Sequence, residues 1–286
     1  MKIYKNKIFI FFIYFISFVL FIYFLYKINQ YLSIENYQNN YQTNQIPKMI
    51  YQTHKNQLFI ENHPSLKNAQ ESWKKNTKKG FQYKFYDDKH CDDFMKINYP
   101  GKIYKIYKKL PLGVMKSDLW RYCVIYQYGG IYADVDTICK MNVNDFIVPV
   151  NSKKGPYLVC TPELGSNLFC QWVFAAPPKS PILKSIIDTC IEKLEQFDKI
   201  KNENKHKQKQ IVYQTTGPKA FTNGILKYIQ TNHLKVYPSM KDYCHPKKQI
   251  QQMKVFEPND FHKKKVIHLY FGLDKDGWKK EAIQSL

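Results

Sequence analysis

Arginine is nearly missing from this chain, because Arg121 is the only arginine among its 286 residues. Lysine therefore supplies almost all of the positive charge, and the formal net charge is +21. Proteins that read bases or grip phosphates favour arginine, whose planar guanidinium makes paired hydrogen bonds that lysine cannot reproduce. We therefore interpret the surplus charge as solvated lysine surface and expect no nucleic-acid partner.

Short cysteine motifs and glycosylation signals are also missing. The seven cysteines include no C-x-x-C pair and no zinc-finger spacing, so a zinc site is not expected. In an oxidising compartment one or more disulfides can form, but their connectivity cannot be read from the sequence. No N-x-S/T acceptor occurs, so N-glycosylation gives no information on topology.

Charge is absent from one long stretch, residues 8–26, which is apolar apart from a single serine and follows a lysine-rich start. At 1.5 Å per residue the stretch makes about 28 Å of helix, close to the hydrocarbon thickness of a bilayer. A cleaved signal peptide is the alternative, but its apolar core is usually shorter and ends in small residues. We predict a cytosolic tail over 1–7, a single-pass type II anchor over 8–26, a polar stem over 27–45, and a domain over 46–286 in the Golgi or ER lumen.

Strand-like and helix-like segments alternate through the rest of the chain, which predicts an α/β fold with a parallel sheet. Ligands bind such sheets beyond the carboxyl ends of the strands. The expected strands are Lys48–Gln52, Gln82–Tyr86 and 131–136, and the expected helices are Pro64–Thr77, Asp88–Asn98, Gly113–Tyr128 and Pro181–Phe197.

Two carboxylates, Asp134 and Asp136, stand close together in an otherwise apolar run. In an extended strand, side chains two residues apart point the same way, so both carboxylates would lie on one side. Mg²⁺ and Mn²⁺ prefer oxygen ligands, usually one or two carboxylates with water and substrate phosphates. The pair therefore predicts a metal and diphosphate site, although the polar end of a strand is the plain alternative.

The helix expected just upstream carries two more charged candidates. Asp118 and Arg121 lie three residues apart on one helical face, with Ser117 as an N-cap candidate and Gly129-Gly130 as the stop. They are either an exposed ion pair, worth at most about 1 kcal/mol, or groups that hold hydroxyls beside the metal site.

The string S-D-L-x-R-Y-x-x-x-Y-x-x-G-G-I-Y-A-D-x-D-T, residues 117–137, resembles the signature of the DXD-containing sugar transferases. This family includes the fungal α-1,6-mannosyltransferases and the inositolphosphoceramide mannosyltransferases, and is distantly like the clostridial glucosylating toxins. The resemblance covers about 46–280. It implies a glycosyltransferase-A (Rossmann-like) nucleotide-sugar-binding fold with a nucleotide-sugar half over 46–140 and an acceptor half over 141–286.

The resemblance also implies roles for single residues. Asp118, Arg121, Asp134 and Asp136 would be catalytic, and Asp134, Asp136 and His268 would hold the metal, although a lone histidine in a strand is more often a hydrogen-bonded core residue. The implied donor-binding residues are Gln52, Gly129, Gly130, Tyr132, Gln171 and Trp278. Four positions depart from the family pattern: Tyr51 and His54 replace the His and Trp of its usual H-Q-T-W, Gln171 replaces its usual Asn, and Gly277 its usual Ser.

The carboxylate pair and the resemblance together predict a metal-dependent glycosyltransferase, and the resemblance implies that it is a retaining one. It would use Mn²⁺ or Mg²⁺ and move a hexose, with mannose favoured, from a GDP- or UDP-linked donor to a glycan or glycolipid. A metal-dependent nucleotide-sugar hydrolase or phosphotransferase, and a non-catalytic carbohydrate-binding membrane protein, are the alternatives.

Overall fold

The computed structural model describes residues 15–25, 45–147, 157–197, 208–245, 247–248, 250 and 252–271. The chain divides into two units, Met1–Thr43 and Asn44–Leu286. Residues 15–25 are helical, and the remainder of the predicted tail and anchor, with nearly all of the stem, lies outside the described residues. No helix within the described part of the chain is both long enough and apolar enough to cross a membrane.

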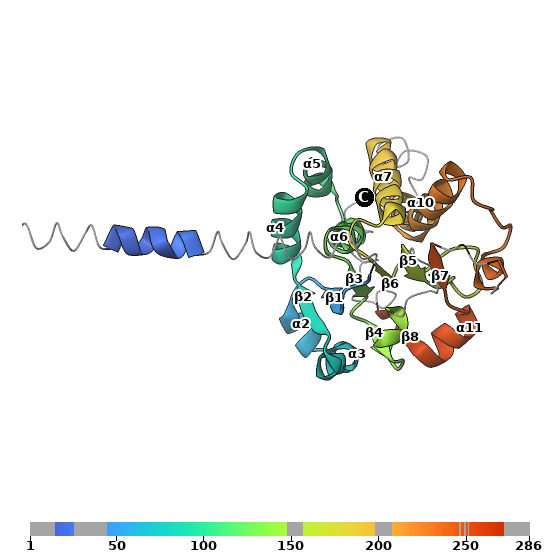
Figure 1. Ribbon diagram of the computed structural model, residues 1–286, viewed down its shortest axis with the longest axis horizontal. Helices are drawn as coiled ribbons and strands as arrows, with labels where there is room; N and C mark the ends of the chain where they lie inside the picture. The colour runs from blue at the N-terminus through green and yellow to red at the C-terminus, as the bar shows by residue number, and fades with distance from the viewer. Residues whose placement is uncertain are drawn as a thin grey trace, which may run out of the picture. The chain divides into compact units, whose positions relative to one another are not determined.

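A six-stranded sheet of order β2-β1-β3-β6-β5-β7 forms the centre of the second unit (Figure 1). β2, β1 and β3 are mutually parallel, β6 is antiparallel to both β3 and β5, and β5 is parallel to β7. The predicted α/β fold is thus confirmed as a mixed, parallel-rich sheet, and β6 departs from the all-parallel expectation. The strands are β1 (Met49–Thr53), β2 (Gln82–Tyr86), β3 (Gly130–Ala133), β5 (Leu158–Cys160), β6 (Val173–Ala176) and β7 (Met253–Val255).

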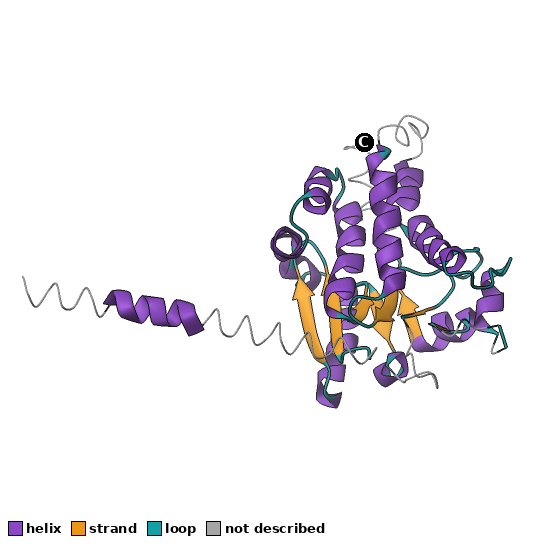
Figure 2. Ribbon diagram, turned by 45° about the horizontal axis from the view of Figure 1, so that its top comes forward, coloured by secondary structure: helices purple, strands orange, loops and turns teal. Residues whose placement is uncertain are grey.

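Helices and turns cover both faces of this sheet, as Figure 2 shows. Because successive strand residues point to opposite faces, Tyr51 and Tyr132 pack with α6, α7 and α10, whereas Ile50 and Ile131 pack with α3, η2 and η4. The helices are α2 (Gln57–Glu61), α3 (Pro64–Lys74), α4 (Asp88–Asn98), α5 (Lys102–Lys109), α6 (Gly113–Tyr128), α7 (Pro181–Glu195), α9 (Gln208–Thr215), α10 (Pro218–Thr231) and α11 (Pro258–Asp260). The short turns are η1 (Lys75–Lys79), η2 (Val143–Phe146), η3 (Met240–Cys244) and η4 (Phe261–Lys265).

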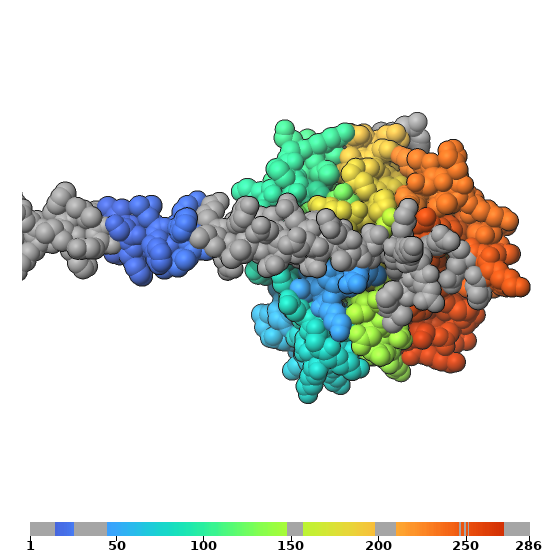
Figure 3. Space-filling view, in the orientation of Figure 1, coloured from blue at the N-terminus to red at the C-terminus, as the bar shows by residue number. Residues whose placement is uncertain are grey.

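A second, two-stranded sheet joins distant parts of the sequence. β4 (Thr137–Cys139) pairs antiparallel with β8 (Val266–His268), so that Thr137 lies opposite His268. In Figure 3 the green-yellow segment that includes β4 lies beside the red segment that includes η4 and β8. This pairing carries the C-terminal part of the chain to the residues that directly follow Asp136.

The buried helix α6 ends where β3 begins, and two glycines make the change of direction possible. Gly129 has φ +65° and closes the helix through its N–H to the Ile125 carbonyl at 2.8 Å. A Cβ on Gly129 would lie 2.5 Å from Cδ of Pro178, and a Cβ on Gly130 would lie 2.7 Å from the Met49 carbonyl oxygen. Both positions therefore require glycine for backbone reasons.

Three local predictions are wrong in informative ways. Ser117 is no N-cap, because α6 already begins at Gly113 and Ser117 lies inside it. The expected strand 131–136 ends at Ala133, after which the chain turns and starts β4 in the other sheet. The helix expected over Pro64–Thr77 ends at Lys74, where a 3₁₀ turn takes over. All seven cysteines are free thiols.

Candidate active site

The two acids of the D-x-D motif lie in a tight turn between β3 and β4. The Asp134 carbonyl oxygen accepts hydrogen bonds from the N–H and Oγ1 of Thr137, at 3.2 and 2.5 Å, and from Nε2 of Gln52, at 3.1 Å. Val135 turns instead into a small apolar cluster with Ile60. The turn, and not the predicted extended strand, is what holds the two carboxylates near one another at the carboxyl end of β3.

His268 reaches the same place through the pairing of β8 with β4. Its Nε2 lies 3.3 Å from Oδ1 of Asp136, and the other carboxylate oxygen of Asp136 accepts the N–H of Phe271 at 3.0 Å. Ligand atoms of Asp134, Asp136 and His268 all lie within 4.8 Å of one another. The structure therefore assembles the three predicted metal ligands from segments more than a hundred residues apart in sequence.

Arg121 lies between two carboxylates. Its Nη2 is 3.1 Å from Oδ1 of Asp118, its Nη1 is 3.0 Å from Oδ1 of Asp134, and its guanidinium sits 4.6 Å from the centre of the Tyr132 ring. Only 5% of the Arg121 side chain and 1% of the Asp118 side chain are exposed. The pair is therefore buried, and the alternative of a solvated surface ion pair is wrong.

Asp118 is enclosed by hydrogen-bond donors as well as by Arg121. Nε2 of Gln171 donates to Oδ1 at 3.1 Å, and the hydroxyl of Thr216 donates to Oδ2 at 3.0 Å. The Tyr122 hydroxyl in turn contacts Oε1 of Gln171. Burial raises the pKa of Asp118 to about 7, because these partners and Arg121 offset only part of the desolvation of its charge.

The two acids of the motif differ in protonation behaviour. Burial raises the pKa of Asp134 against the opposing charge of Arg121. Burial also disfavours the charge of Asp136, but the hydrogen bond and charge of His268 and the Phe271 N–H outweigh it, so the pKa of Asp136 is lowered. Asp136 is therefore the more firmly ionised of the two near neutral pH.

The other predicted donor-binding residues have mixed placements. Gln52 is fully buried, and its amide is engaged by the Asp134 carbonyl and by the Tyr83 hydroxyl at 2.9 Å. The Tyr132 hydroxyl contacts Oδ1 of Asp134. Gly129 and Gly130 lie at the opposite end of β3 from the acids. Trp278 lies outside the described residues, and the donor-binding roles of all these residues stay predictions.

Trp172 belongs to this site although no sequence signal pointed to it. Its ring stacks on His268 with centroids 4.8 Å apart and planes 9° apart, and its carbonyl oxygen accepts the Asp134 N–H at 2.7 Å. Thr216 was not among the predicted site residues either, yet its hydroxyl donates to Asp118. Both residues act through long-range contacts that the linear sequence does not display.

The donor set fits a hard divalent cation. Asp134 and Asp136 offer carboxylate oxygens on side chains that remain 24% and 14% exposed, unlike the enclosed Asp118. The imidazole Nε2 of His268 lies beside them, and its buried Nδ1 has no hydrogen-bond partner. Two carboxylates with room for water and phosphate oxygens are the environment in which proteins bind Mg²⁺ or Mn²⁺.

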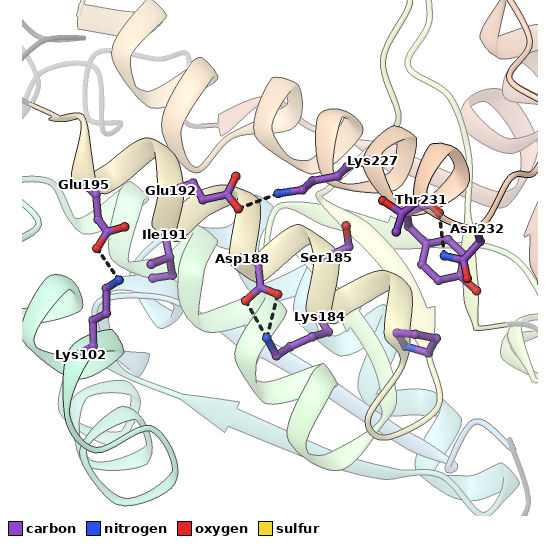
Figure 4. Close-up of a pocket in the computed structure, with 12 residues that line it drawn as sticks. Lys102, Lys184, Ser185, Asp188, Ile191, Glu192, Glu195, Lys227, Thr231 and Asn232 are labelled. Carbon is purple, nitrogen blue, oxygen red and sulfur yellow. Dashed lines mark hydrogen bonds and ion pairs between the residues drawn. The ribbon is translucent and has the colours of Figure 1, made fainter.

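A pocket of about 420 Å³ lies elsewhere, on the helical layer formed by α5, α7 and α10 (Figure 4). Its charged residues pair with one another, as Lys184 does with Asp188 at 2.7 Å and Lys227 with Glu192 at 2.6 Å. None of the residues around the D-x-D turn lines it. Its charges are thus already neutralised, and it does not contribute to the candidate active site.

Comparison with known proteins shows what this part of the chain is similar to. Residues 63–152 match the model for "Glycosyltransferase sugar-binding region containing DXD motif". The initiation-specific alpha-1,6-mannosyltransferase of Schizosaccharomyces pombe is 27% identical over 64% of this chain and 49% of its own length. Inositol phosphoceramide mannosyltransferase 1 of the same organism is 29% identical over 68% of this chain and 56% of its own length.

The match therefore spans about half the length of these two curated relatives. Among solved structures, the PaToxG glycosyltransferase has a TM-score of 0.46 at 16% identity, covering 71% of this chain and 78% of that chain. The family model and the relatives agree with the resemblance carried by residues 117–137, so this part of the chain is similar to the DXD-containing sugar-binding region of glycosyltransferases.

Proposed function

We propose that this chain is a metal-dependent, retaining glycosyltransferase of the glycosyltransferase-A fold, which transfers a hexose from a nucleoside-diphosphate sugar. The observation that carries this proposal is the convergence of Asp134, Asp136 and His268 within 4.8 Å, directly beside Arg121. A sugar leaves its nucleotide as the diphosphate gains negative charge, and a bound divalent cation neutralises that charge.

The residues of the chain then have distinct tasks in the proposal. Asp136, held ionised by His268 and the Phe271 N–H, would bind the cation directly, with Asp134 and His268 as its further ligands. Arg121 would face the diphosphate oxygens, because its guanidinium is fixed by two carboxylates and the Tyr132 ring. Asp118 would accept a hydroxyl of the donor sugar once substrate displaces one of its present donors.

Mannose is the favoured sugar, with a GDP- or UDP-linked donor. Two relatives are named for mannose transfer, one of them to inositol phosphoceramide. We therefore propose a glycan or glycolipid acceptor, and Mn²⁺ or Mg²⁺ as the cation. The proposal includes an N-terminal anchor over residues 8–26, based on the uncharged apolar run there, with the catalytic unit in the Golgi or ER lumen.

A product assay tests the proposed activity. The purified full chain is incubated with GDP-mannose and with a panel of other GDP- and UDP-sugars, Mn²⁺, and glycan or glycosylinositol lipid acceptors. The proposal predicts sugar on an acceptor, and loss of the product when a chelator is present. Release of free sugar without transfer in every combination would instead favour a nucleotide-sugar hydrolase.

Asp136→Asn is the matched variant, because it removes the charge and keeps the shape, and Asp93→Asn is its control. Asp93 is an exposed acid of α4 that forms an ion pair with Lys89 at 3.4 Å. Transfer that survives in Asp136→Asn, or in excess chelator, would contradict the metal-dependent mechanism.

A further inference from the structure

A second group of potential metal ligands lies apart from the D-x-D turn. One ligand atom each of Glu163, Cys170 and His262 lies within 4.8 Å of the other two. Cys170 is fully buried and His262 is 9% exposed. The three residues supply oxygen, sulfur and nitrogen, the mixture that zinc accepts and that Mg²⁺ avoids.

Backbone hydrogen bonds fix two of these ligands opposite each other. Pro162 and Phe169 form a β-bridge, the Glu163 N–H donates to the Leu168 carbonyl at 2.9 Å, and the Cys170 N–H donates to the Thr161 carbonyl at 2.8 Å. The loop therefore closes on itself before any ion is bound. Its two ligand side chains are positioned by main-chain bonds, which leaves less conformational entropy to lose on binding.

His262 approaches from η4, a separate segment of the chain. Its Nε2 lies 3.5 Å from Sγ of Cys170. In a tetrahedral zinc site with Zn–S near 2.3 Å and Zn–N near 2.0 Å, the sulfur and nitrogen are expected about 3.5 Å apart. The observed separation therefore already suits an ion between the two atoms.

The surrounding groups complete the arrangement. The indole N–H of Trp172 donates to Oε1 of Glu163 at 2.9 Å, which orients the carboxylate as ligating carboxylates usually are. The Pro162 carbonyl oxygen lies 2.9 Å from Nε2 of His262. Without an ion, that nitrogen carries a proton and donates to the carbonyl, and with an ion the proton must move to Nδ1.

We propose that Glu163, Cys170 and His262 bind one Zn²⁺ ion, with the Pro162 carbonyl oxygen or a water as the fourth ligand. The ion would fasten the loop of residues 162–169 to η4. It would also bear on the active site, because Trp172 contacts Glu163 with its N–H and stacks on His268 with its ring. The proposal does not depend on the sugar-transfer function.

Cobalt is the probe, because a thiolate bound to Co²⁺ absorbs in the near ultraviolet and the D-x-D turn contains no sulfur. The purified full chain is stripped with a chelator and then titrated with Co²⁺ in excess Mg²⁺. We expect sulfur-to-cobalt absorption that saturates at one equivalent and that Zn²⁺ abolishes. A titration that produces no such absorption overturns the proposal, leaving a hydrogen-bonded thiol and imidazole.

Matched variants assign the absorption to this cluster. Cys170→Ala should remove it, whereas Cys190→Ala, an equally buried free thiol on α7, should keep it. Asp136→Asn should also keep it, since that residue belongs to the other site. Unchanged absorption in Cys170→Ala would overturn the assignment.

A second, milder variant still tests the proposal if Cys170→Ala does not fold. Glu163→Gln retains the shape of a partly exposed side chain and should weaken Co²⁺ binding at least about tenfold. Zn²⁺ should raise the unfolding midpoint of the stripped wild-type chain by more than that of Glu163→Gln. Equal affinities and equal shifts in the two proteins would contradict a ligating role for Glu163.

Discussion

The charged side chains at the two ends of the candidate active site differ in burial and in the partners that offset their charge. At the closed end, Asp118 and Arg121 neutralise much of each other's charge, and Gln171 and Thr216 enclose the Asp118 carboxylate. At the open end, Asp136 pairs with His268 and accepts the Phe271 N–H, and its side chain is 14% exposed against 1% for Asp118. Asp134 lies between the two ends and pairs with Arg121.

This difference indicates that the buried residues hold the geometry of the site, whereas the more accessible residues are placed to bind the cation. Buried charges that have each other as partners keep their geometry whether or not a ligand is present. A partly exposed carboxylate with a lowered pKa is available to an external cation. The closed end should therefore matter for both folding and turnover, and the open end mainly for turnover.

The largest expected effect is that of Arg121→Met. It leaves Asp118 and Asp134 without their cation, and removal of one partner from a buried ion pair costs about 3–5 kcal/mol of unfolding free energy. Urea unfolding measures this loss, with Lys116→Met on the same helix as the control. Nζ of Lys116 lies over the Tyr107 ring, 6.0 Å from its centroid, and loss of this cation–π contact should cost no more than about 1 kcal/mol. Equal losses of unfolding free energy in the two variants would show that the buried ion pairs of Arg121 do not stabilise the fold more than the contact of Lys116 does.

Asp136→Asn should have the next largest effect. We expect it to lower the rate of turnover more than the free energy of unfolding. Loss of the charge that holds the cation should raise the activation free energy by about 4 kcal/mol, which is about a thousandfold in rate. The urea midpoint should fall by less than that of Arg121→Met, because only the pairing of Asp136 with His268 loses its charge and the Phe271 N–H keeps an acceptor. A large drop in stability without loss of rate would mean that the open end is structural.

Asp118→Asn tests the burial of the closed end through the pH dependence of the unfolding free energy. The folded pKa of about 7 lies above the ordinary value of 3.8, so the folded chain binds this proton more tightly than the unfolded chain does. The resulting stabilisation is complete below about pH 3.8 and is lost as pH rises through about 7. In chelator, the unfolding free energy of wild type relative to Asp118→Asn should therefore fall between pH 4 and pH 7. Parallel curves over that interval would contradict the raised pKa.

Lys184→Gln should have the smallest effect. Lys184 pairs with Asp188 across one turn of α7, and both side chains are about half exposed in the pocket of Figure 4. Exposed pairs of this kind contribute about 0.3–0.5 kcal/mol. A urea midpoint that moves as far as that of Arg121→Met would show that burial is not what distinguishes the two ion pairs.

Local patterns in the sequence predicted much of the fold. Gln82–Tyr86, Asp88–Asn98 and Gly113–Tyr128 have the bounds that were expected for a strand and two helices. They are set by short-range signals, such as the side chain of Asp87 capping α4 and the positive φ of Gly129 closing α6. Signals of this kind act within a few residues and are visible in one stretch of sequence.

Long-range partners could not be predicted in the same way. The D-x-D spacing suggested a strand, but the hydrogen bonds from Thr137 and Gln52 to the Asp134 carbonyl make a turn. The position of His268 depends on the pairing of β8 with β4, and that of Trp172 on the antiparallel pairing of β6 with β3. The family resemblance supplied His268 as a candidate, whereas nothing in the sequence supplied Trp172.

The most direct test of the account is the binding of a nucleoside diphosphate with and without a cation. Calorimetric titration of GDP and UDP into the full chain should show binding in Mn²⁺. In chelator, or with Asp136→Asn in Mn²⁺, the affinity should be at least about 100-fold weaker, which is about 3 kcal/mol. Equal affinity of the diphosphate in all three conditions would contradict the claim that Asp136, together with Asp134 and His268, holds a cation for the leaving group.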